Sequence, residues 1–322
     1  MPDDRGERLD VATLGEAMAA LRCSGSISHG DGLTVSVAGA ESNVAIGLAR
    51  LGHSTAYFGA VGDDAFGKLV RRTLRAEGVN TTGLRTSTDA STGIISFQQP
   101  VAGITSVDYY RADSAGASIS AEDGASVARG QARIVHLTGI TPALSVSAAA
   151  ATERAMRAAR ENGALVSFDV NFRSKLWTRS EAAAVLRPLA TLADVIVASK
   201  DELALVAPSS GATLDEMAES LCAAGVHQVV VKRGARGASL YQADSRLDQD
   251  AFPVRAVDTI GAGDAFTAGF LSATLDGLDR EGRLDRACTL GAFAVAHMGD
   301  WEGLPTRSQL GLLHALEGES LR

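Results

Sequence analysis

Short apolar, β-branched runs alternate along the chain with longer segments in which apolar residues recur every three or four positions. The short runs predict strands at Val11–Gly15, Thr55–Gly59, Ile134–Leu137, Leu165–Phe168, Val195–Val197 and Val229–Lys232. The longer segments predict helices at Ser42–Leu51, Phe66–Glu77, Ser147–Asn162, Ser180–Ala193, Leu214–Ala224, Asp264–Leu275, Asp285–His297 and Ser308–Glu317. Such alternation is typical of an α/β fold with a mostly parallel central sheet and helices on both faces.

Two regions interrupt the alternation, at about 22–38 and about 92–112. The first contains several glycines and the period-2 stretch Leu33–Val37, and in the second Ile94–Phe97 and Val107–Tyr109 flank a turn. These patterns predict extra strands joined by hairpins. We interpret them as a small β-sheet lid, formed by two insertions, over the carboxyl edge of the main sheet. No linker or repeat is visible, so we expect a single α/β domain over residues 1–322.

Composition and charge limit the class, the partners and the cellular location that we expect for the protein. The 322 residues are 46% hydrophobic and 21% charged, as in an ordinary globular protein. The formal net charge is −8, which repels a phosphate backbone, so we expect no nucleic-acid partner. No apolar run approaches the length of a membrane span, and the N-terminus lacks the apolar core of a signal peptide. We therefore expect a cytoplasmic protein without membrane contact, and the three scattered cysteines indicate neither disulfides nor zinc.

The segment Asp258–Phe266 carries the most chemical information. Gly261 and Gly263 leave the backbone free to turn just before a predicted helix, where exposed N–H groups and the helix dipole attract anions. Asp264 at that place is either a base beside the anion site or a simple helix cap. The residues alone do not decide between these two interpretations.

This segment resembles the C-terminal signature of the PfkB/ribokinase family of carbohydrate kinases. Ala38–Gly52 and Gly62–Gly67 resemble the N-terminal signature, Lys232–Gly237 resembles the glycine turn on the nucleotide side, and Gly15-Glu16 matches the family opening. The pieces occur in family order over essentially the whole chain. The resemblance implies a ribokinase-like fold and phosphorylation of a sugar-type primary hydroxyl by ATP.

The resemblance also implies roles for individual residues. Asp264 matches the catalytic base, Gly261, Ala262 and Gly263 match the anion hole, and Lys232, Gly234 and Gly237 match the nucleotide site. The family motif Asn-x-x-Glu, which organises Mg²⁺, is here Ser199 to Glu202, so Glu202 acting through ordered water is the expected metal contact. Asp258 matches a position linked to a monovalent cation such as K⁺.

A lone arginine beside tyrosines, Tyr109-Tyr110-Arg111, suggests an acidic substrate, because a guanidinium binds both oxygens of a carboxylate. The set resembles the 2-keto-3-deoxygluconate kinase branch of the family. That branch implies a sugar-acid site formed by Gly39, Ala40, Glu41, Ser42, Asn43, Tyr109, Tyr110, Arg111, Arg173 and Asp300, with Asn171 and Arg173 near the phosphates. Ile94 stands where that branch often has a tyrosine after Thr-Gly.

The expected reaction is transfer of the γ-phosphoryl group of ATP to the terminal hydroxyl of 2-keto-3-deoxygluconate, with Asp264 and Arg173 as catalytic residues. A kinase for a neutral sugar such as ribose or fructose, or for a nucleoside, is the nearest alternative. A non-catalytic sugar or nucleotide sensor is an alternative of another class. Because lid strands leave an exposed edge that tends to pair, we also expect a homodimer.

Overall fold

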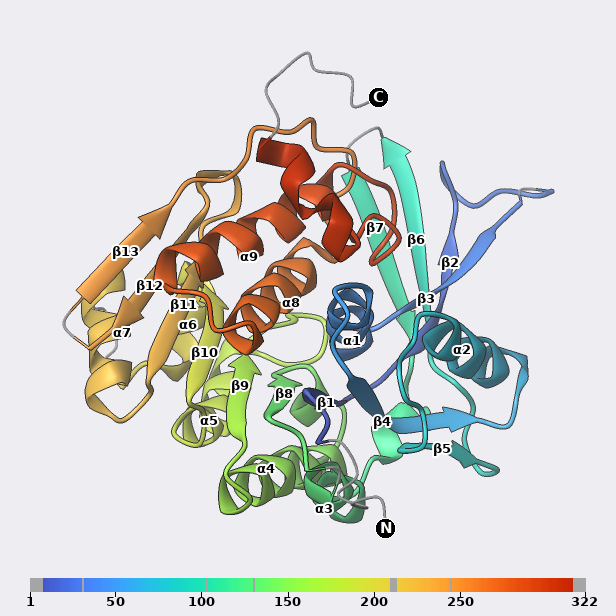
Figure 1. Cartoon of the computed structure of the whole chain (residues 1–322). Coiled ribbons are helices and arrows are strands. Elements are labelled where there is room, and N and C mark those ends of the chain that lie inside the picture. Colours follow the sequence, from blue (N-terminus) through green and yellow to red (C-terminus); the bar gives the residue numbers. More distant parts are fainter. Residues whose placement is uncertain are drawn as a thin grey trace, which may run out of the picture.

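The computed structural model describes residues 8–30, 32–101, 104–129, 131–208, 213–243 and 245–314 (Figure 1). A nine-stranded sheet has the order β13-β12-β11-β10-β9-β8-β1-β4-β5. Its strands are β1 (Val11–Leu14), β4 (Thr55–Gly62), β5 (Leu84–Ser87), β8 (Ile134–Thr138), β9 (Leu165–Asp169), β10 (Val195–Ser199), β11 (Gln228–Lys232), β12 (Ala238–Gln242) and β13 (Ser245–Gln249). In this sheet the seven neighbouring strands β11, β10, β9, β8, β1, β4 and β5 pair in parallel, whereas β12 and β13 add an antiparallel edge. The predicted, mostly parallel central sheet is confirmed.

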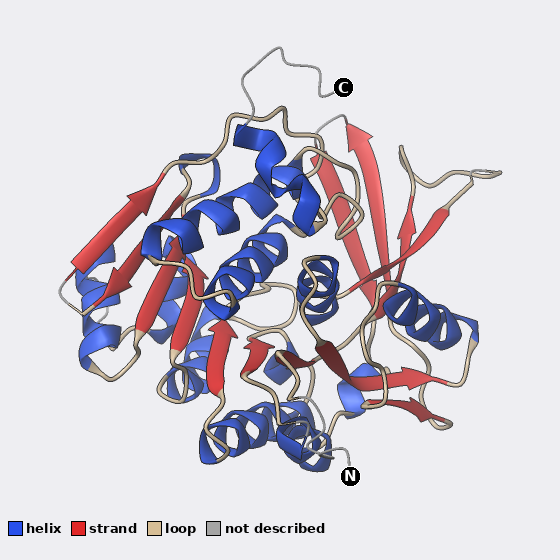
Figure 2. Cartoon of the chain, viewed as in Figure 1, coloured by secondary structure: helices blue, strands red, loops and turns tan. Residues whose placement is uncertain are grey.

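Helices cover both faces of this sheet (Figure 2). One face packs against α1 (Ala40–Arg50), α2 (Ala65–Ala76), α8 (Ala262–Leu275) and α9 (Arg280–Val295). The other packs against α3 (Ala121–Arg129), α4 (Val146–Glu161), α5 (Arg179–Ala190), α6 (Lys200–Val206) and α7 (Leu214–Ala223). The predicted last helix, Ser308–Glu317, is a 3-10 helix over Arg307–His314, and its final residues lie outside the described part of the chain.

Strand β10 shows why the central strands are apolar throughout. Val195 and Val197 enter the core on the α8 side, and Ile196 and Ala198 enter the core on the α5 side. Successive side chains of a strand point to opposite faces, so a strand covered on both faces needs apolar residues at every position. Each fully buried valine or isoleucine stabilises the fold by about 1.5–3 kcal/mol.

A second, four-stranded sheet has the order β3-β2-β6-β7 and extends away from the main body (Figure 1). Its strands are β2 (Met18–Arg22), β3 (Thr34–Ala38), β6 (Ile94–Val101) and β7 (Ile104–Tyr110). Strand β2 begins four residues before the first interrupted region of the sequence. Alternation is hard to see there because Met18–Leu21 is apolar throughout, and only the packing of Met18 and Ala20 against Ile95 and Phe97 reveals the buried face.

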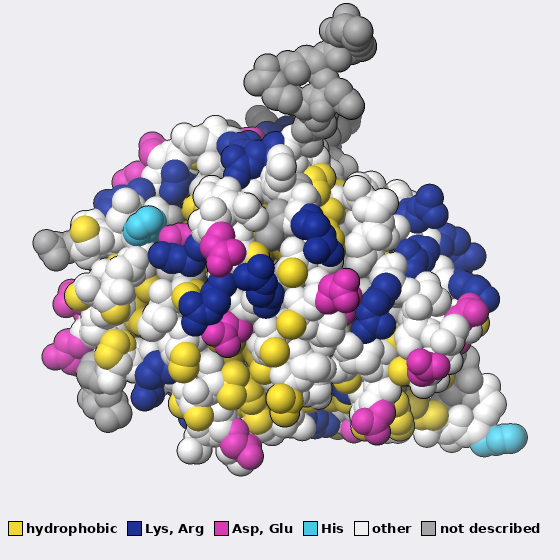
Figure 3. Space-filling view, turned by 90° about the horizontal axis from the view of Figure 1, so that it is seen from below, with side chains coloured by type: hydrophobic (Ala, Val, Ile, Leu, Met, Phe, Trp, Pro, Cys, Tyr) yellow, Lys and Arg dark blue, Asp and Glu magenta, His cyan; other side chains and the backbone are white. Residues whose placement is uncertain are grey.

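Five further elements had no clear signal in the sequence. Strands β5 and β13 are short and polar, and β12 follows β11 through a tight turn. Helices α3 and α6 have only nine and seven residues, which is too short for a convincing apolar period. In the described part of the chain, no helix is both long and apolar enough to cross a bilayer. The face seen in Figure 3 carries side chains of both charge signs.

The carboxyl ends of the parallel strands bring polar residues to one edge of the main sheet. Asp169 ends β9, Ser199 ends β10 and Lys232 ends β11, and the register pairs Ser199 with Lys232. The N-termini of α1 and α8 lie near the same edge, because residues from both helices line the cavity found there. Ligands of open α/β sheets bind at this edge, so the fold predicts the functional site there.

Candidate active site

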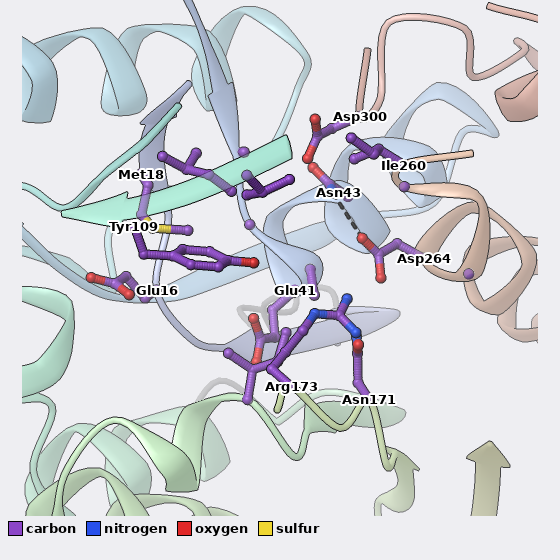
Figure 4. A pocket seen from close by; sticks show the side chains of 18 of the residues that line it. Glu16, Met18, Glu41, Asn43, Tyr109, Asn171, Arg173, Ile260, Asp264 and Asp300 are labelled. Atoms are coloured by element: carbon purple, nitrogen blue, oxygen red, sulfur yellow. Dashed lines mark hydrogen bonds between the residues drawn. The ribbon is translucent and has the colours of Figure 1, made fainter. Parts of the chain in front are cut away.

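A cavity of about 410 Å³ lies between the carboxyl edge of the main sheet and the four-stranded sheet (Figure 4). The four-stranded sheet contributes a mostly apolar wall, and the main sheet and the starts of α1 and α8 contribute polar groups. The lining includes Met18, Ile95, Phe97, Val107, Tyr109, Arg111, Gly39, Glu41, Asn43, Asn171, Arg173, Ser199, Glu202, Lys232, Gly261, Gly263, Asp264 and Asp300. Most of the residues predicted for the site are thus brought together.

The start of α8 presents backbone N–H groups and a carboxylate to this cavity. Gly261 precedes the helix with φ +72°, a left-handed conformation that favours glycine. A Cβ at Gly261 would also lie only 1.9 Å from the carbonyl oxygen of Asp300. Both restraints require glycine, and they hold the first turn of α8, with Asp264, against the cavity.

Asp264 is buried and has a strongly perturbed carboxyl group. Burial raises its pKa to about 7, although a hydrogen bond from Asn43 and the charge of Arg173 act in the opposite direction. Asn43 Nδ2 donates to Asp264 Oδ2 at 2.8 Å, and Figure 4 shows Arg173 across the cavity from the carboxylate. A pKa near 7 is well matched to a general base at neutral pH. Asp264 lies in the first turn of α8, whose N-cap is Gly261 without a side-chain capping bond, so the carboxylate does not act as the helix cap.

Lys232 supplies a positive charge at the start of α8. Its Nζ donates to both carboxylate oxygens of Asp169, at 3.0 and 2.8 Å, and Thr267 Oγ1 donates to the same group. Burial lowers the pKa of Lys232, but Asp169 and Glu202 outweigh it and raise the pKa above its usual value. The ammonium lies near Gly263, because a Cβ built there would be 3.3 Å from Lys232 Nζ.

Ser199 and Glu202 form a capping box at the start of α6. Glu202 Oε2 accepts the N–H of Ser199 at 2.7 Å, and Ser199 Oγ accepts the N–H of Glu202 at 3.3 Å. Glu202 Oε1 also accepts the N–H of Phe172 at 3.1 Å. The serine therefore preserves the helix cap where the family pattern has asparagine, because both residue types cap well. The same bonds fix the orientation of the Glu202 carboxylate.

Arg111 lines the cavity, but its guanidinium is already paired. Arg111 Nε donates to Glu16 Oε2 at 2.6 Å, Nη2 forms an ion pair with the same carboxylate, and Ser114 Oγ donates to Oε1. Arg111 and Glu16 are 8% and 3% exposed, so this is a buried pair. The pairing role of Glu16 was missed by the sequence analysis, since only its place beside the first strand was visible.

Two predicted substrate residues lie outside the cavity lining. Tyr110 is 65% exposed, because it follows Tyr109 in β7 and points to the opposite face. Ser42 turns its hydroxyl back to the carbonyl of Gly39 at 2.8 Å. Glu41, in contrast, reaches the cavity, where its Oε1 accepts hydrogen bonds from Thr138 and Thr141 at 2.7 and 2.8 Å and where burial raises its pKa.

Asp258 and Asp300 share a partner that the sequence analysis did not single out. Arg22, the last residue of β2, reaches both carboxylates. Burial raises the pKa of Asp300 to about 6, and the charge of Arg22 acts in the opposite direction. Asp300 lines the cavity, whereas Asp258 belongs to the loop that leads to Gly261. The only sign of this role in the sequence is that Arg22 is a single charged residue at the end of the apolar strand β2.

A second cavity of about 540 Å³ meets the first at the start of α8. It shares Lys232, Thr259 and Gly263 with the first cavity, and its wall is mainly apolar. The wall includes Gly234, Gly237, Phe252, Pro253, Val254, Ala262, Phe266, Cys288, Gly291, Ala292 and Val295. The nucleotide-side residues Gly234, Gly237 and Ala262 thus line this second cavity. Two ligands bound in these cavities would meet at the N-terminus of α8.

The chain is similar to known proteins over most of its length. The model of the pfkB family of carbohydrate kinases matches residues 8–307. A 2-dehydro-3-deoxygluconokinase of Bacillus subtilis is 34% identical over 308 residues, with 94% of each chain covered. A fructokinase of Escherichia coli is 34% identical over 283 residues, covering 84% of this chain and 90% of that protein. The crystal structure of 2-dehydro-3-deoxygluconokinase from Thermotoga maritima has a TM-score of 0.86 at 25% identity, covering 95% of this chain and 98% of that one.

Proposed function

The chain belongs to the pfkB family of carbohydrate kinases and has its ribokinase-like fold, and from this premise we propose that it phosphorylates the terminal hydroxyl of 2-keto-3-deoxygluconate, also called 2-dehydro-3-deoxygluconate, with ATP. The observation that carries the proposed phosphoryl transfer is the buried Asp264 at the start of α8, with a pKa of about 7, in a cavity that Arg173 also lines. The match to the Bacillus subtilis enzyme supports the choice of substrate.

In the proposed reaction Asp264 removes the proton of the sugar hydroxyl as the hydroxyl oxygen attacks the γ-phosphorus. The bond from that phosphorus to the leaving ADP breaks, and the proton stays on Asp264. The N–H groups of Gly261, Ala262 and Gly263, together with Arg173 and Lys232, stabilise the negative charge of the transferring group. Positioning and electrostatics dominate such transfers, so the pairs that fix these side chains matter for the rate.

We place the nucleotide base in the second, apolar cavity, with its phosphates directed toward Lys232 and Asn171. Bound Mg²⁺ would neutralise charge on the β- and γ-phosphate oxygens. Glu202 fits this ion through ordered water, because its two oxygens each already accept a backbone N–H. Among the described residues no group of three or more His, Cys, Asp or Glu is placed to hold a metal. An ion held largely by phosphate and water needs no such group.

The sugar acid would occupy the first cavity, under the four-stranded sheet acting as a lid of the single domain. Tyr109, Arg173 and the Nη1 group of Arg111, which the pairing with Glu16 does not use, are what we assign to its carboxylate side. Asn43 suits a sugar hydroxyl, because its Oδ1 is buried and has no partner among the described residues. Asp300, Glu41 and Gly39 complete the polar side of the cavity.

The second candidate substrate is a neutral sugar, because a fructokinase matches the chain at the same identity as the sugar-acid kinase. An ATP-consumption assay with 2-keto-3-deoxygluconate, its galactonate epimer, fructose, ribose and a nucleoside separates the candidates. We expect the highest kcat/KM with a sugar acid. A preference for fructose would overturn the sugar-acid assignment, and no turnover with any acceptor would favour a non-catalytic sensor. A cytoplasmic location, where ATP and Mg²⁺ are available, is part of the proposal.

We also propose a homodimer through the four-stranded sheet. Three apolar residues are exposed here: Leu33, directly before β3, is 39% exposed, Val35 in β3 is 49% exposed, and Tyr110 at the end of β7 is 65% exposed. β3 and β7 are the edge strands of this sheet, and neither pairs with a further strand in the part of the chain that the structure describes; exposed apolar edges tend to pair. Native mass should show a dimer that Val35→Asp converts to a monomer. A monomeric wild type at assay concentration would overturn this assignment.

A further inference from the structure

Arg22 joins the four-stranded sheet to the loop that leads into α8. Its Nη1 lies 3.3 Å from Asp258 Oδ2, and its Nη2 forms an ion pair with Asp300 Oδ1. The guanidinium carbon also lies 3.9 Å from the centre of the Phe97 ring, on strand β6 of the same sheet. The side chain is thus held by one aromatic face and two carboxylates.

The two carboxylates depend on this one charge. Asp258 and Asp300 are 5% and 7% exposed, so water stabilises the negative charge of each carboxylate only weakly. Among the residues that the structure describes, Arg22 is the only Lys, Arg or His with a charged nitrogen within 4 Å of either carboxylate. A buried carboxylate without a partner is strongly unfavourable, so two of them beside one guanidinium require that guanidinium.

The same carboxylates shape the anion-binding loop. Asp258 Oδ1 accepts the N–H of Ile260 at 3.1 Å, and Oδ2 accepts the N–H of Gly299 at 3.4 Å in addition to Arg22. The backbone of Asp300 lies directly against Gly261. Arg22 therefore stabilises both sides of the turn that presents the N–H groups of α8.

A monovalent cation at the Asp258 carboxylate does not fit this arrangement. Both oxygens of Asp258 already accept N–H donors, and one of these donors is a guanidinium. A second cation on the same carboxylate would lie beside a like charge in a buried region, where repulsion is weakly screened. The K⁺ implied by the family resemblance and the guanidinium of Arg22 are therefore alternative cations for the Asp258 carboxylate.

We propose that Arg22 replaces the monovalent cation at Asp258, so that this kinase carries its own cation and needs no added K⁺. The guanidinium differs from an ion in that it cannot leave and that it belongs to the sheet over the cavity. Arg22 is a positioning residue in this scheme, because it acts through Asp258, Asp300 and Gly261. The inference concerns the cation and does not depend on which sugar is the acceptor.

Thermal unfolding tests the proposal without sugar or nucleotide. The full-length wild type and Arg22→Met are unfolded in KCl and in tetramethylammonium chloride of equal ionic strength. We expect the same Tm in both salts for the wild type, and a Tm higher by a few degrees in KCl for Arg22→Met, because an ion that binds only the folded protein raises its Tm. A Tm of the wild type that rises specifically with K⁺ would overturn the proposal.

Kinetics with ATP and the best acceptor provide the second readout. The wild type should change less than about twofold between the two salts, and Arg22→Met should lose at least about tenfold in kcat/KM in tetramethylammonium, a factor equivalent to about 1.4 kcal/mol. K⁺ should restore part of that loss. Arg22→Lys, which keeps the charge, should retain more activity than Arg22→Met. A loss that K⁺ leaves unchanged in both readouts would reduce Arg22 to a structural contact.

Arg50→Met is the matched control. Arg50 also fastens the segment after Asp300, since its Nη1 donates to the carbonyls of Trp301, Glu302 and Leu304, but no bond to Asp258 or Asp300 is seen for it. Its loss should lower Tm equally in both salts. A K⁺-specific recovery in Arg50→Met would also count against the proposal. If Arg22→Met does not fold, the salt response of the wild type and the activity of Arg22→Lys still test the proposal. A K⁺-specific rise in the Tm of the wild type would overturn it.

Discussion

The two cavities that meet at the start of α8 are built from opposite kinds of side chain. In the first, buried charges are held in pairs, such as Arg111 with Glu16 and Lys232 with Asp169. In the second, the wall is apolar apart from backbone and a few groups at the junction. Paired charges cannot be changed singly without leaving a partner unpaired, whereas an apolar wall tolerates small changes in shape. We therefore expect substitutions in the first cavity to cause large and specific losses of activity, and substitutions in the second cavity to cause graded losses.

Asp264→Asn should have the largest effect. We expect kcat to fall roughly 10²–10⁴-fold, because the amide cannot accept the hydroxyl proton as a positioned base does. Stability should change little, since asparagine has the same shape and remains compatible with the first turn of the helix. Steady-state kinetics and Tm on the purified variant check both statements. A folded variant with near-normal kcat would remove Asp264 from the role of base.

Arg111→Ala should have the next largest effect. Removing one charged partner in a closed site costs about 2–5 kcal/mol in kcat/KM, which is roughly 30-fold to several thousand-fold. We expect that loss for the sugar acid and a smaller one for fructose, with KM for ATP little changed. Equal losses on both acceptors would mean that Arg111 supports the site without binding the carboxylate.

The pairing with Glu16 adds a second consequence to the same substitution. Arg111→Ala should also lower stability by about 3–5 kcal/mol, because Glu16 would remain buried without its partner. The double variant Arg111→Ala with Glu16→Gln removes that unpaired charge. It should recover much of the Tm without recovering the preference for the sugar acid, which separates the two effects.

The pH dependence of kcat/KM should report the ionisation of Asp264 in the first cavity. Because burial raises the pKa of Asp264 to about 7, the active, ionised form becomes scarce below that pH. We expect kcat/KM to fall about tenfold per pH unit below about 7 and to level off above it. The residual activity of Asp264→Asn serves as control and should lack this limb. The same limb in the variant would assign the titration to another group.

The sequence predicts local features of this site better than its pairings. The loop and helix from Asp258 to Phe266 form one continuous segment, so glycines and the carboxylate there could be interpreted directly. Glu16 and Arg22 act through partners about 95 and 236 or more residues away, and no local pattern encodes such contacts. Tyr109 and Tyr110 could not be told apart because the orientation of β7 was unknown, and a shift of one residue exchanges the two faces.

Gly291→Leu should give the smallest of these losses, on the apolar side. Gly291 lies on α9 and lines the second cavity, where a leucine side chain would occupy space assigned to the nucleotide base. Overfilling an apolar site costs about 1–3 kcal/mol, so KM for ATP should rise roughly 5-fold to 150-fold while KM for the sugar stays unchanged. A matching rise in the sugar KM would contradict the separation of the two cavities.

Gly291→Ala is the control that separates size from backbone effects. A Cβ at Gly291 would lie 3.8 Å from the carbonyl oxygen of Ala262 and 3.9 Å from Phe266 Cβ, which are ordinary contacts. Alanine in a helix interior is favoured over glycine by about 0.5–1 kcal/mol, so this variant should have a slightly higher Tm and normal kinetics. If the alanine variant also loses affinity for ATP, the backbone of α9 and not the volume of the cavity governs the nucleotide.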